Sequence, residues 1–315
     1  MFINRVSYYV PELRIPNAFF EPLNGLTEDW ILERTGIKER RKAKEGENSH
    51  TMSVEATRSL IEQEPKLSAQ EIDLVVAGTY TAYDTVTTMG HAIQNFLDCS
   101  EIPVVTISSA CSTLLNAVEI VEGYFAMGKA STALVVVSDH NSAYYNAQDP
   151  KSGHLWGDGA AALLISKERS GEKSLKIKKI TTAGAGNVGQ AMNGVSLKPF
   201  DGGIQMPGGR DVFLHACNYM AKSTKEILDE NGYSVDDLTY LIPHQANLRI
   251  TKNVAQNLGI DESKAVTNVT YLGNTGCAGC GIGLAEKWDS IKKDDIIVMT
   301  VFGGGYSYGA MLLEA

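Results

Sequence analysis

The sequence lacks any apolar run long enough to span a bilayer. Even the longer runs, such as residues 160–165, fall far short of the ~20 residues that a membrane helix needs. It also lacks a basic excess, because 28 Lys and Arg residues are outnumbered by 37 Asp and Glu residues and the formal net charge is −9. Proteins that bind nucleic acids gain affinity by placing Lys and Arg on phosphates. We therefore predict neither a membrane-spanning protein nor a nucleic-acid binder.

Cysteine is scarce and odd in number, which makes a disulfide framework a poor interpretation. The five cysteines are Cys99, Cys111, Cys217, Cys277 and Cys280. The pair Cys277 and Cys280 has the C-x-x-C spacing of a zinc or redox site, but no second pair completes a four-ligand set. We predict that these two thiols pack in a glycine-rich helix start and that the chain binds no metal.

Low-complexity linkers and a signal peptide are also missing. Residues 1–9 alternate apolar and polar side chains and contain no continuous apolar stretch of the kind that directs secretion. The 315 residues are 43% hydrophobic and 21% charged, which is the composition of an ordinary globular protein. This length suits two domains or one large duplicated domain. We expect a cytoplasmic protein.

The first half of the sequence alternates strand-like and helix-like segments. Its apolar runs end in turn signals and predict strands at 72–78, 104–107, 133–138 and 160–165. Helical periodicity predicts helices at 53–62, 89–97 and 112–127. Strands that alternate with helices of this length favour parallel pairing through crossover helices.

The second half repeats this plan after a polar, turn-rich segment at 167–173. We predict helices at 211–231, 248–258 and 277–290, and strands at 238–242, 265–268 and 295–302. Each half closes with an aromatic residue, glycines and an apolar strand, at Trp156 and at Phe302. The sequence therefore predicts one α/β body built from two duplicated halves, at residues 1–166 and 174–315.

Cys111 is the first candidate for chemistry. It follows the predicted strand at 104–107 and immediately precedes the predicted helix, so its sulfur is expected at a helix N-terminus. The helix dipole and free N–H groups there favour the thiolate, which is the nucleophilic form of cysteine. The alternative is that Cys111 is a small buried side chain with no chemical role.

Two further candidates follow strands in the second half. His244 comes after the predicted strand at 238–242, and Asn274 lies between the predicted strand at 265–268 and the following helix. Taken singly, His244 has the alternative role of a helix cap and Asn274 that of a turn residue. Open α/β sheets gather their ligand sites at the carboxyl ends of strands. We therefore expect Cys111, His244 and Asn274 to meet in one site.

A cysteine with a nearby histidine has two chemical interpretations. In a cysteine hydrolase, the histidine takes the proton of the thiol as a base. If the helix already activates the thiol, His244 and Asn274 are free to donate hydrogen bonds to one oxygen, which stabilises an enolate beside a thioester. The glycines at 303–305 then offer backbone N–H groups to the oxyanion of a tetrahedral intermediate.

At these residues the chain resembles the β-ketoacyl-acyl-carrier-protein synthase III family of the thiolase superfamily. The matching segments run in family order from about residue 34 to near the C-terminus. They are Arg34-Thr-Gly-Ile-Lys-Glu-Arg, Ser109-Ala-Cys-Ser, Trp156-Gly-Asp-Gly-Ala, Pro243-His-Gln-Ala-Asn-Leu-Arg-Ile, Gly273-Asn-Thr-Gly and Phe302-Gly-Gly-Gly-Tyr-Ser-Tyr-Gly. The resemblance implies a thiolase-like, five-layered α-β-α-β-α fold with duplicated halves.

The resemblance also implies roles for the candidate residues. Cys111 would accept an acyl group from acyl-CoA, and His244 and Asn274 would hold the carbonyl of malonyl-carrier protein as it loses CO₂. The N–H groups of Cys111 and Gly304 would form the oxyanion hole. Residues implied to contact coenzyme A or the carrier protein are Trp30, Arg34, Phe213, Asn247 and Arg249. A homodimer, acyl-carrier protein as partner and no cofactor are likewise implied.

Two departures from the family pattern concern the substrates. The arginine that completes the family's adenine clamp has no clear counterpart near Lys151 and Ser152, and the aromatic residue of the acyl pocket is replaced by Val86. A smaller side chain at Val86 widens or reshapes the pocket, so the acyl primer stays open. We expect an enzyme that initiates fatty-acid synthesis. The alternatives are a ketosynthase or acyltransferase of secondary metabolism and a non-catalytic partner of the same fold.

Overall fold

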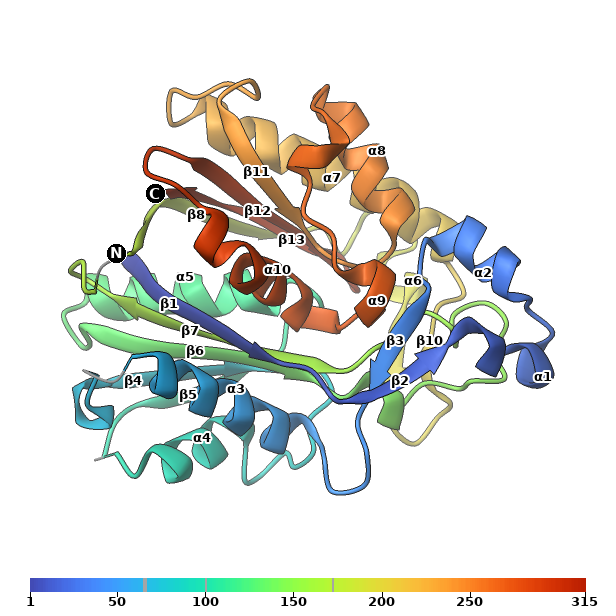
Figure 1. Cartoon of the computed structure of the whole chain (residues 1–315), viewed down its shortest axis with the longest axis horizontal. Coiled ribbons are helices and arrows are strands. Elements are labelled where there is room, and N and C mark those ends of the chain that lie inside the picture. Colours follow the sequence, from blue (N-terminus) through green and yellow to red (C-terminus); the bar gives the residue numbers. More distant parts are fainter. Residues whose placement is uncertain (65–66, 100, 172) are drawn as a thin grey trace.

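The main sheet has nine strands. The structure is a computed structural model of the 315-residue chain and describes residues 1–64, 67–99, 101–171 and 173–315. Neighbouring strands follow the order β11-β12-β13-β8-β1-β7-β6-β4-β5 (Figure 1). Their bounds are β1 Phe2–Tyr9, β4 Leu74–Gly78, β5 Val104–Ile107, β6 Thr132–Asp139, β7 Gly159–Ser166, β8 Leu175–Gly184, β11 Leu238–Pro243, β12 Ile296–Gly303 and β13 Ser307–Glu314.

The sheet consists of two similar halves joined by a short contact. Strands β1 and β8 pair only at Phe2 with Lys176 and at Ile3 with Leu175. On one side of this contact the order is β1-β7-β6-β4-β5, and on the other it is β8-β13-β12-β11. The first four strands of each half correspond in chain order, which confirms the predicted duplication. The exact division at residues 166 and 174 stays a prediction.

Helices and strands form five layers. Helices α5 (Thr113–Ala126) and α10 (Gly279–Lys287) lie between the two halves of the sheet and contact strands of both (Figure 1). Helices α3 (Ser49–Gln63) and α4 (Met89–Leu97) cover the outer face of the first half, and α7 (Gly209–Asp229) and α8 (Leu248–Leu258) cover that of the second. The predicted α-β-α-β-α arrangement is confirmed.

The remaining short elements lie mainly at the end of the molecule near α2. The strands among them are β2 Leu13–Pro16, β3 Glu39–Lys42, β9 Ser196–Lys198 and β10 Gly203–Gln205. The α-helices are α1 Glu21–Asn24, α2 Glu28–Thr35, α6 Ala191–Gly194 and α9 Val269–Leu272. The 3₁₀ turns are η1 Asn17–Phe19, η2 Ala69–Glu71, η3 Asn141–Ala143, η4 Glu262–Lys264, η5 Gly276–Ala278 and η6 Trp288–Ser290.

Strand pairing is mixed rather than parallel throughout, which corrects the prediction from the alternating pattern. Strand β4 is parallel to β5 and β6, and β11 is parallel to β12. Every other neighbouring pair of the main sheet is antiparallel. The antiparallel strands include β1, which the sequence analysis did not identify as a strand, in the middle of the sheet.

The predicted strand at 265–268 is wrong. The backbone N–H of Val266 donates to the carbonyl of Leu241 over 2.8 Å, but no described strand forms there. The side chain of Gln245 takes the place of a neighbouring strand: its Nε2 donates to the carbonyl of Val266, and its Oε1 accepts from the N–H groups of Asn268 and Val269. These bonds satisfy backbone groups that a strand ladder would otherwise use.

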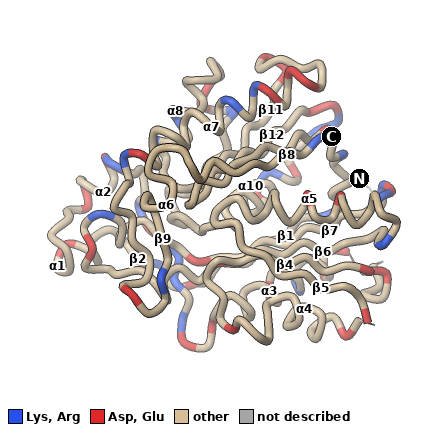
Figure 2. Tube along the Cα trace, turned by 180° about the vertical axis from the view of Figure 1, so that it is seen from behind, with Lys and Arg blue, Asp and Glu red and all other residues tan. Residues whose placement is uncertain are grey.

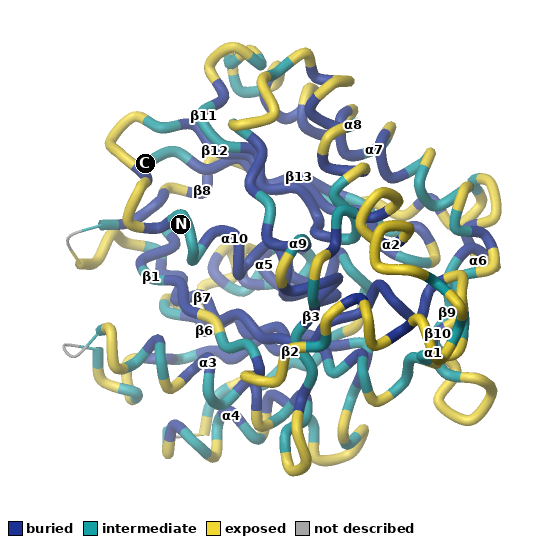
Figure 3. The backbone as a smooth tube through the Cα atoms, turned by 45° about the vertical axis from the view of Figure 1, so that its right-hand side comes forward, coloured by how far each residue is buried: buried dark blue, intermediate teal, exposed yellow. Residues whose placement is uncertain are grey.

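The core lies around the central helix layer. All residues of β7 and of β12 are buried, which explains their continuous apolar sequences (Figure 3). The small residues of α10 let this helix approach the sheet closely, since a Cβ on Gly281 would lie 2.6 Å from Cβ of Ala161. Charged residues lie largely on outer helices and loops (Figure 2). Within the described residues, no helix is both long and apolar enough to cross a bilayer.

Candidate active site

Cys111 lies in a tight turn between β5 and α5. The preceding residue, Ala110, has a φ of +48°, a left-handed conformation that is rare for a residue with a Cβ. Two bonds of Thr113 support it: the hydroxyl donates to the carbonyl of Ala110 over 2.6 Å and accepts from the N–H of Ser109 over 2.8 Å. This strained turn places Cys111 immediately before the helix, as predicted. Such turns occur at functional sites.

The environment of the Cys111 sulfur raises rather than lowers its pKa. Burial, together with the carboxylate of Asp139, raises the pKa of the thiol to about 12. Hydrogen bonds from the Gly304 N–H, the Tyr80 hydroxyl and the N–H of Cys111 itself act in the opposite direction. The expected helix-activated thiolate is therefore corrected: the resting thiol is protonated at neutral pH.

Glycines after β12 bring the chain against the start of α5. A Cβ on Gly303 would lie 2.9 Å from the backbone nitrogen of Cys111, so only glycine allows this approach. The N–H of the next residue, Gly304, then reaches the Cys111 sulfur. The N–H groups of Cys111 and Gly304 both act to lower the pKa of the Cys111 thiol, and their role as an oxyanion hole stays a prediction.

His244 is neutral and nearly buried. It directly follows β11, and its N–H donates to the carbonyl of Thr300 on β12 over 2.8 Å. Its side chain is 4% exposed, and burial lowers its pKa to about 4. Among the described residues, Nδ1 has no hydrogen-bond partner. The imidazole is therefore uncharged at neutral pH and holds one proton for donation.

Asn274 is fixed through its backbone and through its amide oxygen. Its N–H donates to the carbonyl of Leu155 over 2.8 Å, and its carbonyl accepts from the N–H of Gly157 over 2.9 Å. The N–H of Gly276 donates to Asn274 Oδ1 over 3.0 Å. Because this bond uses the oxygen, it leaves the amide hydrogens for another acceptor.

The three predicted residues border one cavity. A space of about 110 Å³ is lined by Cys111, His244, Asn274 and Phe213, among others. A second, mainly apolar space of about 400 Å³ also reaches Cys111 and includes Tyr80. The sulfur of Cys111 therefore lies where the two spaces meet.

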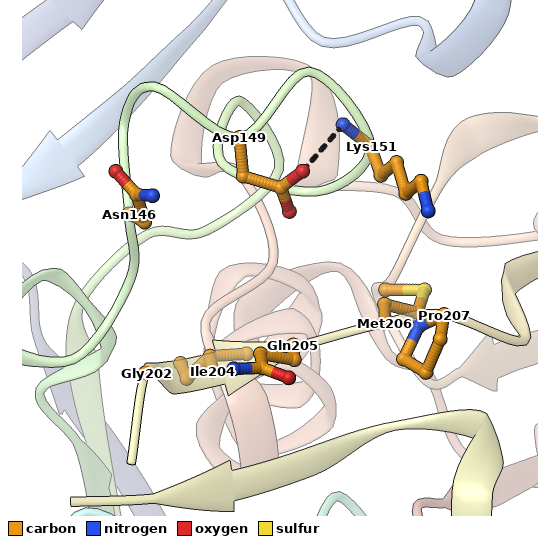
Figure 4. Close-up of a pocket in the computed structure, with 8 residues that line it drawn as sticks. All are labelled: Asn146, Asp149, Lys151, Gly202, Ile204, Gln205, Met206 and Pro207. Carbon is orange, nitrogen blue, oxygen red and sulfur yellow. Dashed lines mark hydrogen bonds between the residues drawn. The ribbon is translucent and has the colours of Figure 1, made fainter. Parts of the chain in front are cut away.

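A third cavity adjoins these two. It measures about 360 Å³ and shares Ile204 with the larger space and Met206 with the smaller one (Figure 4). Its polar side is formed by Asn146, Asp149 and Lys151, and the N–H of Lys151 donates to Asp149 over 3.0 Å. Lys151, which lies near the missing family arginine, thus brings its side chain to the rim of the site.

Helices α2, α7 and α8 bring together the residues expected to contact coenzyme A. The guanidinium of Arg34 lies 5.7 Å from the ring of Trp30, and that of Arg249 lies 5.8 Å from the ring of Phe213. Asn247 caps α8 by accepting the N–H of Arg249 over 2.8 Å, so its amide has a structural task as well. Phe213 and Asn247 line the smaller cavity, whereas Trp30, Arg34 and Arg249 lie outside its lining.

Val86 does not line either space next to Cys111 in the single chain. Its side chain is 85% exposed, in the loop between β4 and α4. A role in an acyl pocket therefore requires a second copy of the chain and stays a prediction.

Sequence reasoning missed three side chains close to the site. Asp139 ends β6 and was detectable by the same strand-end signal as His244. Tyr80 and Asn141 also lie two residues after strands, β4 and β6, but the contact between them is one between loops: the Tyr80 hydroxyl donates to Asn141 Oδ1 over 2.7 Å. The cysteine pair is buried, and Cys277 and Cys280 each donate to a main-chain carbonyl, of Gly78 and of Ile242.

Comparisons with known proteins agree with this geometry. The model of 3-oxoacyl-[acyl-carrier-protein] synthase III matches residues 105–184, and the model of its C-terminal part matches residues 228–315. The β-ketoacyl-[acyl-carrier-protein] synthase III of Clostridium perfringens is 33% identical, and the alignment covers 97% of this chain and 96% of that protein. The chain belongs to this family. The resemblance found in the sequence is thereby confirmed.

Solved structures of synthase III proteins share the fold. The 3-oxoacyl-[acyl-carrier-protein] synthase III of Aquifex aeolicus matches with a TM-score of 0.92 and 31% identity, over 100% of this chain and 99% of that one. The priming β-ketosynthase of the R1128 polyketide pathway matches with a TM-score of 0.87 and 26% identity, over 99% and 95%. The family fold therefore extends over the whole chain.

Proposed function

We propose that this synthase III family member transfers an acyl group from acyl-CoA to Cys111 and condenses it with malonyl-acyl-carrier protein, which initiates fatty-acid synthesis. The observation that carries the proposal is the shared cavity. A thiol, a neutral histidine and an amide whose donors are unused border the same 110 Å³ space. Two N–H groups face the sulfur of that thiol.

The first half-reaction is acyl transfer. The sulfur of Cys111 attacks the thioester carbonyl carbon, and the negative oxygen that forms is stabilised by the N–H groups of Cys111 and Gly304. Cys111 gives up its thiol proton to solvent in this step, the carbon–sulfur bond to coenzyme A breaks, and the departing coenzyme A thiolate takes up a proton from solvent. The mainly apolar space of about 400 Å³ next to Cys111 accommodates the acyl chain.

The second half-reaction is decarboxylative condensation. His244 and Asn274 donate hydrogen bonds to the thioester oxygen of the malonyl group as CO₂ leaves. The resulting carbanion forms a bond to the acyl carbon on Cys111, the bond from that carbon to the Cys111 sulfur breaks, and the released thiolate takes up a proton. A neutral donor suits this task, because it supplies a hydrogen bond without giving up its proton. The low pKa of His244 keeps it neutral throughout the physiological range.

The binding partners follow from the residues around the cavity. We propose that Trp30, Arg34, Phe213 and Asn247 hold coenzyme A and that the exposed Arg249 contacts the acidic acyl-carrier protein. The lining of the smaller cavity by Phe213 and Asn247 supports this, as do the ring contacts of Arg34 and Arg249. A homodimer, a cytoplasmic location and the absence of a cofactor remain parts of this proposal.

Intact-protein mass spectrometry tests the proposal directly. The protein is incubated with acyl-CoA thioesters of several chain lengths, and Cys111→Ser serves as the matched control. We expect one acyl adduct on the protein and none on the variant. The absence of an adduct with every chain length would contradict the proposed enzyme and favour the non-catalytic alternative.

A second candidate function is priming in secondary metabolism. Two observations favour it: the likeness to a priming polyketide ketosynthase and the small Val86 in place of an aromatic residue. A panel of primers offered with malonyl-carrier protein separates the two. Preference for acetyl or short branched primers supports fatty-acid initiation, whereas preference for longer or functionalised primers supports secondary metabolism.

A further inference from the structure

We propose that Tyr80 is a catalytic residue of this chain, whose hydroxyl turns from Asn141 to the Cys111 sulfur and stabilises it as it gains negative charge, in a space that both residues line and that Gly276 leaves open. This inference rests on the proposed function, because it concerns the nucleophile of that reaction. Tyr80 lies two residues after β4 and lines the same space of about 400 Å³ as Cys111.

Backbone and side-chain bonds hold Tyr80 in this place. Its N–H donates to Asp139 Oδ1 over 3.0 Å, and its hydroxyl donates to Asn141 Oδ1 over 2.7 Å. From this place, beside the space that Cys111 also lines, the hydroxyl acts to lower the pKa of the Cys111 thiol. Asn141 is itself fixed, since its Nδ2 donates to the carbonyls of Gly157 and Asn274 over 2.8 and 3.2 Å. The hydroxyl therefore connects the nucleophile to the segment that carries Asn274.

Gly276 makes room for this hydroxyl. A Cβ at Gly276 would lie 2.6 Å from the Tyr80 hydroxyl oxygen and 2.2 Å from Asp139 Oδ2. Its φ of +62° also favours glycine over any residue with a side chain. The large side chain of Tyr80 therefore fits only because residue 276 is a glycine.

A single hydroxyl hydrogen serves two acceptors in turn. While Cys111 is protonated, the Tyr80 O–H donates to Asn141 and its oxygen accepts the S–H. When the sulfur is negative, the O–H turns to the sulfur, because a charged acceptor forms the stronger bond. The switch requires only rotation about the phenolic C–O bond.

The assisted step is acyl transfer to Cys111. The thiol loses its proton to solvent, the thiolate forms a bond to the carbonyl carbon of acyl-CoA, and the bond from that carbon to the coenzyme A sulfur breaks. The coenzyme A thiolate then takes a proton from solvent. No group is oxidised or reduced, and Tyr80 keeps its proton throughout.

Other ionisable groups face the sulfur from every side. Asp139 at the end of β6 opposes the thiolate, and its own pKa is raised to about 6 by burial. Cys277 and Cys280 face it from the start of α10, and burial raises the pKa of both thiols. His244 borders the same cavity and is neutral above about pH 5. Above pH 7, Asp139 is charged and His244 neutral, so neither changes state in the proposed test.

The test compares Tyr80→Phe with Tyr144→Phe. The control removes a hydroxyl that donates to the carbonyl of Ala82, in the same loop region, and that has no bond to Cys111. Alkylation of Cys111 by iodoacetamide is followed from pH 7 to 10 by peptide mass spectrometry, which separates Cys111 from the other cysteines. Thermal unfolding shows whether both variants are folded.

We expect Tyr80→Phe to slow alkylation of Cys111 by about threefold to tenfold at each pH, so that a given rate is reached only at a higher pH. Tyr144→Phe should leave the dependence of the rate on pH unchanged. The range reflects a lost bond to a charged group, partly offset by the greater nucleophilicity of a more basic thiolate. Equal rates for Tyr80→Phe and the unaltered protein would overturn the inference. So would equal slowing in both variants.

Iodoacetamide needs no substrate site, which keeps this result separate from the proposed function. If acyl-CoA leaves no adduct but alkylation still depends on Tyr80, the proposed function fails and the contact stands. If adducts form on Cys111 at the same rate and with the same pH dependence in Tyr80→Phe, the inference about Tyr80 fails and the proposed function stands.

Discussion

Two features of the structure change the pKa of the Cys111 thiol in opposite directions: hydrogen-bond donors near the start of α5 and the burial of the sulfur. Donors from Gly304, Tyr80 and the backbone of Cys111 favour the thiolate, whereas burial and Asp139 disfavour it more strongly. The pKa of the thiol is raised to about 12, so the thiolate fraction is small at pH 7 and grows with pH.

This raised pKa predicts the pH dependence of Cys111. We expect its alkylation rate to rise about tenfold per pH unit from pH 7 to 9, with no plateau, because the thiolate is the reactive form and the pKa lies above this range. The measurement is site-resolved mass spectrometry with iodoacetamide. A plateau below pH 7 would mean that the helix N-terminus dominates and that the thiol is already ionised at rest.

Replacing His244 distinguishes its two possible roles, a hydrogen-bond donor to the malonyl thioester or a base that takes the proton of Cys111. We expect His244→Ala to change the rate of acyl adduct formation less than about threefold and to slow malonyl decarboxylation by about 10²–10³-fold, since it removes one donor to the developing enolate. Rapid-quench acylation and CO₂ release measure the two steps. His91→Ala, at an exposed histidine, is the control.

Loss of acylation in His244→Ala would instead make His244 the base that activates Cys111, and would favour the cysteine hydrolase. For a neutral donor, we also expect decarboxylation to show no titration of His244 between pH 5 and 8, because its pKa is lowered to about 4. A decarboxylation rate that falls between pH 7 and pH 6 would contradict this, provided that the fall disappears in His244→Gln.

Strand ends predicted Cys111 and His244, but they could not show which other residues near strand ends matter, because that depends on contacts between loops. Cys111 and His244 each follow a strand that the apolar pattern identifies. Tyr80 gains its position from Asn141 and from the absent side chain at Gly276, which no local pattern records. The protonation state of Cys111 was also beyond the sequence, because it depends on how deeply Asp139 and the thiol are buried.

Among the elements, the segment after η4 shows where local pattern and tertiary structure disagree. Residues 265–268 have the apolar character of a strand and occupy the place of β5 in the repeat. Their backbone groups instead bond to one side chain, Gln245, which is fully buried. Helix bounds were closer to expectation: α8 spans the predicted residues, and α3 begins earlier, at Ser49, because Asn48 caps it.

The bonds of Gln245 predict its contribution to stability. We expect Gln245→Ala to lower the free energy of unfolding by about 2–4 kcal/mol, because the substitution leaves the N–H of Asn268 and the carbonyl of Val266 without their partner in the interior. Gln256→Ala, on the exposed side of α8, is the matched control and should change it by less than about 0.5 kcal/mol. Urea unfolding measures both.

An equal, small effect of the two glutamine variants would show that 265–268 holds its conformation without Gln245. The result also bears on the site, because this segment leads through α9 to Asn274. We therefore expect Gln245→Ala to weaken decarboxylation as well, to a lesser degree than His244→Ala.

For the whole molecule, the duplicated fold places the nucleophile and its donors on opposite halves. Cys111 begins the central helix of the first half, and His244 and Asn274 belong to the second. The site lies between them, so it forms only when the two halves pack together. Because the net charge is −9, docking of an acidic carrier protein would need a local basic surface, and we expect Arg249 to supply it, since the neighbouring Lys252 pairs with Glu262 at 3.1 Å.

Val86 links the proposed dimer to the choice of primer. It is 85% exposed, and Tyr83 in the same loop is 67% exposed, so this loop carries exposed apolar side chains. If the loop enters the partner's acyl space, as the family resemblance implies, a larger side chain at Val86 shortens the longest acyl group that Cys111 accepts. We expect Val86→Phe to reduce acylation by long acyl-CoA about tenfold or more and to leave acetyl-CoA within about twofold.

Sedimentation equilibrium and intact mass spectrometry check the two parts of this prediction together. The protein should sediment as a dimer, and Val86→Phe should remain one, so that any change in primer length reflects the pocket rather than the assembly. Val54→Phe, at a partly exposed valine on α3, is the control for adding a ring elsewhere. A monomeric protein, or a dimer whose primer range is the same in Val86→Phe, would place the acyl pocket wholly within one chain, where Tyr80 and Met192 then set its length.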